Sequence, residues 1–228
     1  MQPSLLKIFH EEYRALRPRA EMPEFQVMYY HYAGLNSTIR LREGICKVRF
    51  SDILEQAPER VLRALAHILL AKLYRHAVDG RHAMRYRQWA ASRKIAYQTH
   101  RVRQVRGTKH LSGAQGVHYD LEEVFEALNF RHFHGLMARP QLGWSRTASR
   151  RMLGHYDEAH HAIIVSKIFD RPGVPRFAIE YLLFHEMLHL KHPVRLRGSR
   201  RCIHGPAFQA EEREFPHLAE AKAFLKTL

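Results

Sequence analysis

Residues 181–192, YLLFHEMLHLKH, contain the pattern HExxH as His185, Glu186 and His189. Side chains four positions apart share one face of a helix, about 5–6 Å apart, so both imidazoles can converge on one ion. Glu186 is close enough to accept a proton from a water held by that ion without being a ligand. Zinc lowers the pKa of such a water towards about 7. The pattern therefore predicts a hydrolytic zinc site with Glu186 as its acid/base.

Apolar residues surround these three polar side chains, which indicates that the helix is largely buried. Burial of an ionised glutamate and two imidazoles without partners costs several kcal/mol. A bound metal gives a physical reason for all three. The alternative interpretation is a polar stripe on the exposed side of an ordinary helix.

A catalytic zinc usually has three protein ligands and one water. His192 is a poor third ligand, because it lies about 10 Å along the helix axis from His185. His204 opens the segment HGPAFQAEERE, in which a new helix can begin at Pro206. We favour His204, and Glu211 or Glu212 on that helix is the competing ligand.

HEMLH, 14 intervening residues and HGPAF together resemble the SprT-like zinc metallopeptidase family, to which Spartan-type DNA–protein crosslink proteases belong. Residues 119–215 carry the resemblance. Further matches are a helix over 121–125 and the segments LGWSR (142–146), LGHY (153–156) and IIVSKIF (163–169). Residues 216–228 do not contain the zinc-binding ribbon that follows this domain in several relatives, and residues 1–118 lie outside the motif set.

The resemblance implies one zinc ion held by His185, His189 and His204, with Glu186 as the catalytic acid/base. It also implies a zincin-like α+β domain over 119–228, with a small antiparallel sheet and the HExxH helix. Residues 162–166 would belong to the sheet beside the cleft, where an extended protein substrate could add as a strand.

Hydrophobic periodicity predicts the same order of elements twice. Helix, strands and helix are expected at 3–16, 25–32, 36–50 and 58–74, and again at 121–132, 141–145, 151–156, 162–166 and 175–192. An offset of about 116 residues superposes the first series of elements on the second. Leu69, Leu70 and Leu73 then fall at the positions of the HExxH residues His185, Glu186 and His189. We interpret residues 1–80 as a degenerate copy of the protease core. The alternative is two unrelated α+β segments.

The chain is strongly basic, with 37 Lys and Arg against 22 Asp and Glu and a net charge of +15. Such a protein is expected to meet a polyanion, most often nucleic acid. Residues 81–118 contain no acidic residue and are interpreted as a basic connector. Within it, Arg101, Arg103 and Arg106 are candidate DNA contacts, and Tyr86, Trp89 and Tyr97 could stack on bases. The alternative is a solvated helix and linker.

A second basic cluster, Arg195, Arg197, Arg200 and Arg201, lies between His189 and His204. If the zinc prediction holds, this cluster rims the active site. It could select acidic substrates, bind DNA or keep the loop soluble.

Two cysteines exclude a disulfide framework and a four-cysteine zinc ribbon. No secretory signal and no 18-residue apolar stretch is found, so we expect no membrane partner and a cytoplasmic protein, at the nucleoid if it binds DNA. The leading hypothesis is a zinc metallopeptidase that acts on DNA-associated proteins. The rival is a nucleic-acid-binding protein with a structural zinc, whose fourth ligand could be Cys202.

Overall fold

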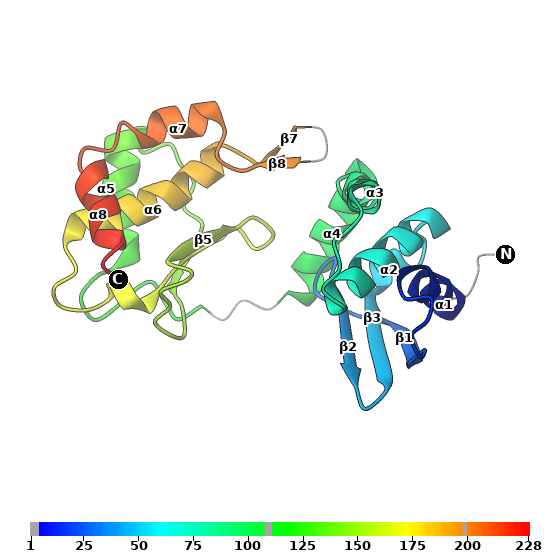
Figure 1. The fold of residues 1–228 in the computed structure, drawn as a ribbon. Helices are drawn as coiled ribbons and strands as arrows, with labels where there is room; N and C mark the ends of the chain where they lie inside the picture. The colour runs from blue at the N-terminus through cyan, green and yellow to red at the C-terminus, as the bar shows by residue number, and fades with distance from the viewer. Residues whose placement is uncertain (1–4, 108–110, 198–199) are drawn as a thin grey trace. The chain divides into compact units, whose positions relative to one another are not determined.

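The computed structural model describes residues 5–107, 111–197 and 200–228 (Figure 1). It divides the chain into two compact units. Of the described residues, the first unit comprises 5–107 with 196, 197 and 200, and the second comprises 111–195 with 201–228. Both mix helices with a small three-stranded sheet, as the α+β prediction requires. Within the described ranges, no helix has both the length and the apolar character needed to cross a bilayer.

The first unit begins with a helix and three strands. Its elements are α1 (Leu5–Leu16), β1 (Glu24–Tyr30), β2 (Ser37–Arg42), β3 (Ile45–Ser51), the short 3-10 helix η1 (Asp52–Leu54), α2 (Glu59–Leu73), α3 (Gly80–Ala90) and α4 (Arg93–Arg106). The sheet order is β1-β3-β2, with β1 parallel and β2 antiparallel to β3. Glu43 and Gly44 both have positive φ, the conformation that a two-residue hairpin turn favours.

One face of this sheet is buried under α1 and α2. Cys46, Val48 and Phe50 of β3 point into that core, where they meet Ile8 and Phe9 of α1. Because side chains alternate along a strand, the residues between them point to the other face.

The second unit repeats this plan. Its elements are α5 (Leu121–Phe133), β4 (Gln141–Trp144), β5 (Gly154–Asp157), β6 (Ala162–Val165), η2 (Lys167–Phe169), α6 (Arg176–Lys191), β7 (Arg195–Arg197), β8 (Arg200–Cys202), α7 (Pro206–Glu212) and α8 (Leu218–Leu225). The sheet order is β4-β6-β5. The predicted antiparallel sheet is wrong in one respect: β4 runs parallel to β6, and only β5 is antiparallel. The sheet is mixed because β6, its central strand, is parallel to one neighbour and antiparallel to the other.

Both units show helix, three strands in the same sheet order, a short 3-10 turn and a second long helix. Ser51 and Ser166 each cap the 3-10 turn, and Pro58 and Pro175 each precede the long helix. The two prolines are 117 positions apart, so the long helices align one residue further along than the predicted offset of 116. A common origin of the two units stays a hypothesis.

With this offset, each buried residue of α2 falls on a buried residue of α6, which also buries Glu180 and Phe184. Ile68, Leu69 and Lys72 then occupy the places of His185, Glu186 and His189, instead of the three leucines named above. Two of these three side chains are apolar, and the third is a lysine. The first unit therefore has no counterpart of the HExxH site.

Helices α3 and α4 contain most of the segment predicted as a connector, and both belong to the first unit. Tyr86 and Trp89 of α3 pack against its core, whereas Tyr97 of α4 is 64% exposed.

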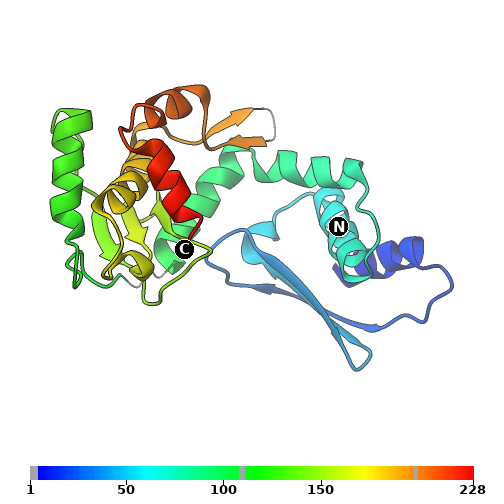
Figure 2. The ribbon, with the colours of Figure 1, turned by 60° about the vertical axis from the view of Figure 1, so that its left-hand side comes forward.

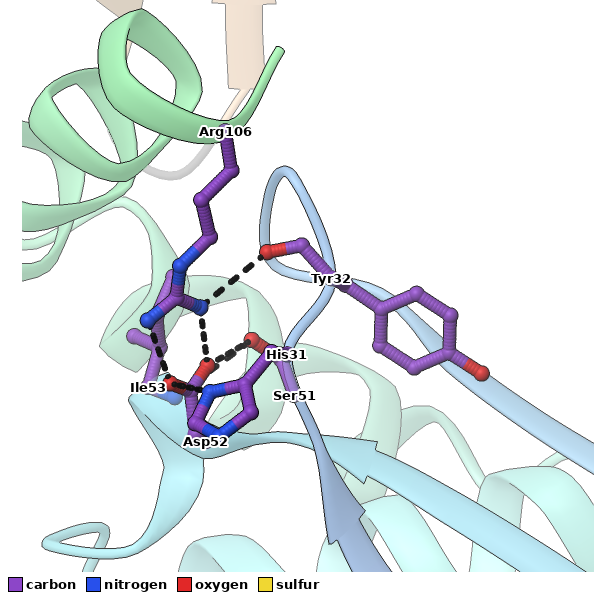
Figure 3. A network of polar contacts seen from close by, with 6 residues as sticks. All are labelled: His31, Tyr32, Ser51, Asp52, Ile53 and Arg106. Atoms are coloured by element: carbon purple, nitrogen blue, oxygen red, sulfur yellow. Dashed lines mark hydrogen bonds and ion pairs between the residues drawn. The ribbon is translucent and has the colours of Figure 1, made fainter.

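The end of α4 is anchored by Arg106 (Figure 3). Its two terminal nitrogens each donate to one carboxylate oxygen of Asp52 at 2.8 Å, and one also donates to the carbonyl of Tyr32 at 3.3 Å. His31 lies 2.8 Å from the same carboxylate. Hydrogen bonds from Arg106, assisted by His31, lower the pKa of Asp52 from 3.8 to about 2. Such a bidentate pair joins two elements far apart in sequence.

We expect Arg106→Gln to lower the melting temperature of the first unit at neutral pH. The pKa of Asp52 is depressed in the folded state, so its stabilising contribution is present above about pH 4 and disappears as pH falls towards about 2. The difference in melting temperature between Arg106→Gln and the wild type should therefore shrink as the pH falls through that range. Thermal melts followed by circular dichroism measure it. Arg103→Gln, an exposed change on the same helix, is the control. A difference that persists undiminished at about pH 2 would contradict this assignment.

Candidate metal centre

Helix α6 carries His185, Glu186 and His189 at the positions that the sequence predicts. It is buried along most of its length, and Glu186 is only 4% exposed. The rings of His185 and His189 lie 5.0 Å apart at nearly a right angle. The expected helix thus presents both imidazoles on one face, next to a buried carboxyl group.

His204 meets the other two histidines, as predicted. It lies between the end of β8 and the start of α7, where Gly205 precedes Pro206. Nε2 of His204 is 3.4 Å from Nε2 of His189, and ligand atoms of all three histidines lie within 4.8 Å of one another. Two nitrogens that bind one tetrahedral zinc at about 2.05 Å are themselves about 3.4 Å apart. The donor set fits zinc.

Glu212 has a role that the sequence did not reveal. Its carboxylate accepts a hydrogen bond from Nδ1 of His185 at 2.7 Å, from the Tyr181 hydroxyl at 3.0 Å and from Lys222 at 3.2 Å. These three donors outweigh the effect of burial and lower the pKa of Glu212. Since Nδ1 of His185 donates to Glu212, its Nε2 is left to bind a metal.

The competing ligand assignments are therefore not supported. Glu212 orients a histidine, and Glu211 pairs with Lys191 at 2.8 Å and lies 3.1 Å from His192. In the part of the chain that the structure describes, neither glutamate joins the group of three histidines.

Phe208 is a site residue that the sequence did not indicate. Its ring is 1% exposed and lies 5.1, 4.8 and 4.7 Å from the rings of His185, His189 and His204. Phe208 and Glu212 are four residues apart on α7, so both lie on the face turned towards α6. That spacing, on a helix expected to start at Pro206, is the signal that could have identified both.

Glu186 is held close to the edge strand β5. The backbone N–H of Tyr156 donates to its carboxylate, and burial nevertheless raises its pKa to about 7. A Cβ atom on Gly154 would lie 3.1 Å from Oε1 of Glu186. The absence of a side chain at Gly154 therefore makes room for the carboxylate.

Burial also favours the neutral forms of the histidines on α6. It lowers the pKa of His185 despite the hydrogen bond to Glu212, and burial together with the other two histidines lowers the pKa of His189 to about 4. Neutral imidazole is the form that binds a metal ion.

The first unit contains a second group of side chains that could hold a metal ion: Glu12, His67 and His82. Their ligand atoms also lie within 4.8 Å of one another. Its geometry fits a metal less well. The rings of His67 and His82 are stacked, 4.2 Å apart and 14° from parallel, so their lone pairs do not converge. Nε2 of His67 also accepts the Asp79 backbone N–H at 3.4 Å.

The predicted arginine contacts have different environments. Arg101 and Arg103 are exposed on α4, whereas Arg106 is bound to Asp52. Arg195 and Arg201 are exposed on the hairpin of β7 and β8. The side chains of Arg197 and Arg200 lie outside the described residues.

No protein-family model matches the chain, and neither the curated proteins nor the solved structures contain a significant match.

We expect His204→Ala to abolish stable zinc binding, since it removes one of three ligands. Glu211→Ala is the matched control on the same segment and should retain the metal. Glu212→Ala should lie between them, with zinc affinity about 10–100-fold weaker, because it loses only the group that orients His185. Metal content after dialysis and competition with a chromogenic chelator measure all three. Zinc retained equally by His204→Ala would contradict the ligand assignment.

Proposed function

We propose that this protein is a zinc-dependent metallopeptidase. The observation that carries the proposal is the convergence of three imidazoles beside a buried glutamate that is not part of the ligand group. The resemblance of residues 119–215 to SprT-like metallopeptidases supports the same activity. One zinc ion is the proposed cofactor, with His185, His189 and His204 as its ligands.

When bound, zinc supplies Lewis acidity to a water and to the scissile carbonyl. Glu186 accepts the proton of the attacking water and passes it to the leaving amine. Burial suits this task, because it brings the pKa of the carboxyl group close to neutral pH. Glu212 and Phe208 are positioning residues that hold the imidazoles in place.

An extended peptide is the substrate that the sheet favours. β5 is an edge strand, and the N–H of Tyr156 on it points to Glu186. A peptide that adds to this edge would bring its backbone next to the proposed catalytic residue. Most of residues 162–166 belong to this sheet as β6, as expected. Because β6 is the central strand and both its edges are already paired, a peptide would add at β5.

DNA-associated proteins are the proposed substrates, on the strength of the net charge of +15 and of the family resemblance. The rival function, a nucleic-acid-binding protein with a structural zinc, needs a filled fourth ligand position. It has less support, because Cys202 is not in the ligand group formed by the described residues.

We expect Glu186→Gln to retain the fold and the zinc but to lose hydrolysis by a factor of about 10²–10⁴. Glutamine is nearly isosteric with glutamate but cannot accept the proton from water. Cleavage of a DNA-binding protein substrate, offered with and without DNA, is followed by electrophoresis, and metal content is measured beside it. If the wild type cleaves no substrate, the result favours the nucleic-acid-binding protein with a structural zinc. If Glu186→Gln cleaves as fast as the wild type, Glu186 is not the acid/base.

We expect Gly154→Ala to reduce hydrolysis with zinc content unchanged. The added methyl would lie 3.1 Å from Oε1 of Glu186 and 3.2 Å from Cδ1 of Leu182, so the carboxylate must move. Misplacement of a reacting group by about 1 Å can cost about 10²-fold in rate. Gly113→Ala, where the new methyl meets nothing within 4 Å, is the control. Full activity in Gly154→Ala would show that the contact with β5 does not position Glu186.

A further inference from the structure

The sheet of the first unit has one face that its helices leave open. Helices α1 and α2 cover the other face, and in Figures 1 and 2 the hairpin of β2 and β3 projects away from them. Four exposed cations lie on this hairpin: Arg40 and Arg42 on β2, and Lys47 and Arg49 on β3. Lys47 pairs with Arg40 across the strands, and Arg49 pairs with Thr38.

These side chains line a hollow of about 590 Å³ together with Tyr30 and Tyr32. The two tyrosine rings lie 4.8 Å apart, and the guanidinium of Arg49 lies 5.1 Å from the centre of the Tyr30 ring. Tyr30 is 46% exposed. The hollow therefore combines clustered positive charge with an accessible aromatic surface.

The described residues do not neutralise the positive charge in this hollow. Across the described ranges, none of the four cations forms an ion pair, and Glu43 is the one acidic residue among those that line the hollow. By contrast, Arg63, Arg106 and Arg176 are each paired with carboxylates. Like charges directly opposite each other destabilise a sheet, as at Arg40 and Lys47. An anionic ligand would remove this repulsion.

The sheet topology itself does not require these charges. In the second unit, with Ser51 aligned to Ser166, the places of Lys47 and Arg49 are taken by Ala162 and Ile164. Both of these residues are buried. The same arrangement of strands therefore carries an apolar face in one unit and a basic, aromatic face in the other.

We propose that this face binds single-stranded nucleic acid, with phosphates at the four cations and an unpaired base on Tyr30. Cations attract any polyanion, but an aromatic face adds affinity only for bases that are free to stack. This distinguishes a single strand from a duplex and from an acidic protein. The inference deepens the nucleic-acid part of the proposed function. It is tested by binding alone, so its failure is distinguishable from a failure of peptide hydrolysis.

The first test measures binding of a fluorescent oligothymidylate to the full chain by anisotropy as a function of salt. Four phosphate contacts predict a slope of log K against log salt of about −2.8, which is about a 50-fold loss between about 50 and 200 mM. Lys47→Gln combined with Arg49→Gln should bring the slope to about −1.4. Arg150→Gln combined with Arg151→Gln removes the same charge from exposed positions of the second unit and should leave the slope unchanged. Equal effects of the two pairs, or a larger effect at Arg150 and Arg151, overturn the proposal.

The second test separates stacking from charge. Tyr30→Leu keeps the bulk of the side chain and should weaken oligothymidylate binding at least about 5-fold, with the salt slope unchanged. Binding of an oligouridylate in parallel distinguishes RNA from DNA as the source of the strand. A duplex bound as tightly as the single strand, polyglutamate that binds equally well, or no effect of Tyr30→Leu overturns the assignment. If the Lys47 and Arg49 double variant does not fold, Arg40→Gln with Arg42→Gln tests the same face.

Discussion

The candidate metal centre depends on the docking of one short helix, α7, against the buried helix α6. His185 and His189 share a face of α6 by local geometry alone, but His204 reaches them only because α7 is held in place. Phe208 packs against all three imidazoles, and Glu212 accepts a hydrogen bond from His185 at 2.7 Å. A contact that loosened α7 would therefore displace a proposed ligand and the group that orients another.

The two units apply one topology to different chemistry. In the second unit, the sheet has a buried central strand and its edge strand β5 lies beside Glu186. In the first unit, the corresponding long helix has no HExxH site, and the open face of the sheet carries Arg40, Lys47 and Arg49 instead. On our two proposals, the second unit hydrolyses peptides and the first binds a single strand. The two proposals together describe a peptidase with a nucleic-acid-binding face on a separate unit of the same chain.

The sequence by itself determined the elements and the central motif. Alternating and helical periodicity predicted α2, α5 and α6 to within a few residues, because these patterns reflect which side chains must be buried. The spacing of His185 and His189 needs only the geometry of a single helix. His204 was predicted from a turn and a helix start nearby in sequence. The helices and the spacing of His185 and His189 depend on local interactions, which a sequence expresses directly. The meeting of His204 with these two histidines also needs the docking of α7.

Only the tertiary structure decided the pairing of strands and the partners of charged groups. The parallel pairing of β4 with β6, and the role of Glu212 as a hydrogen-bond acceptor in place of a ligand, require contacts between distant segments. Arg106 looked like a DNA contact in a basic run, but Asp52, 54 residues earlier, binds it. The hollow on the first sheet was missed because its cations come from two strands, neither with a conspicuous run of charge. Whether a charged side chain is paired, buried or exposed depends on its neighbours in space. These neighbours come from distant segments and cannot be read from the sequence.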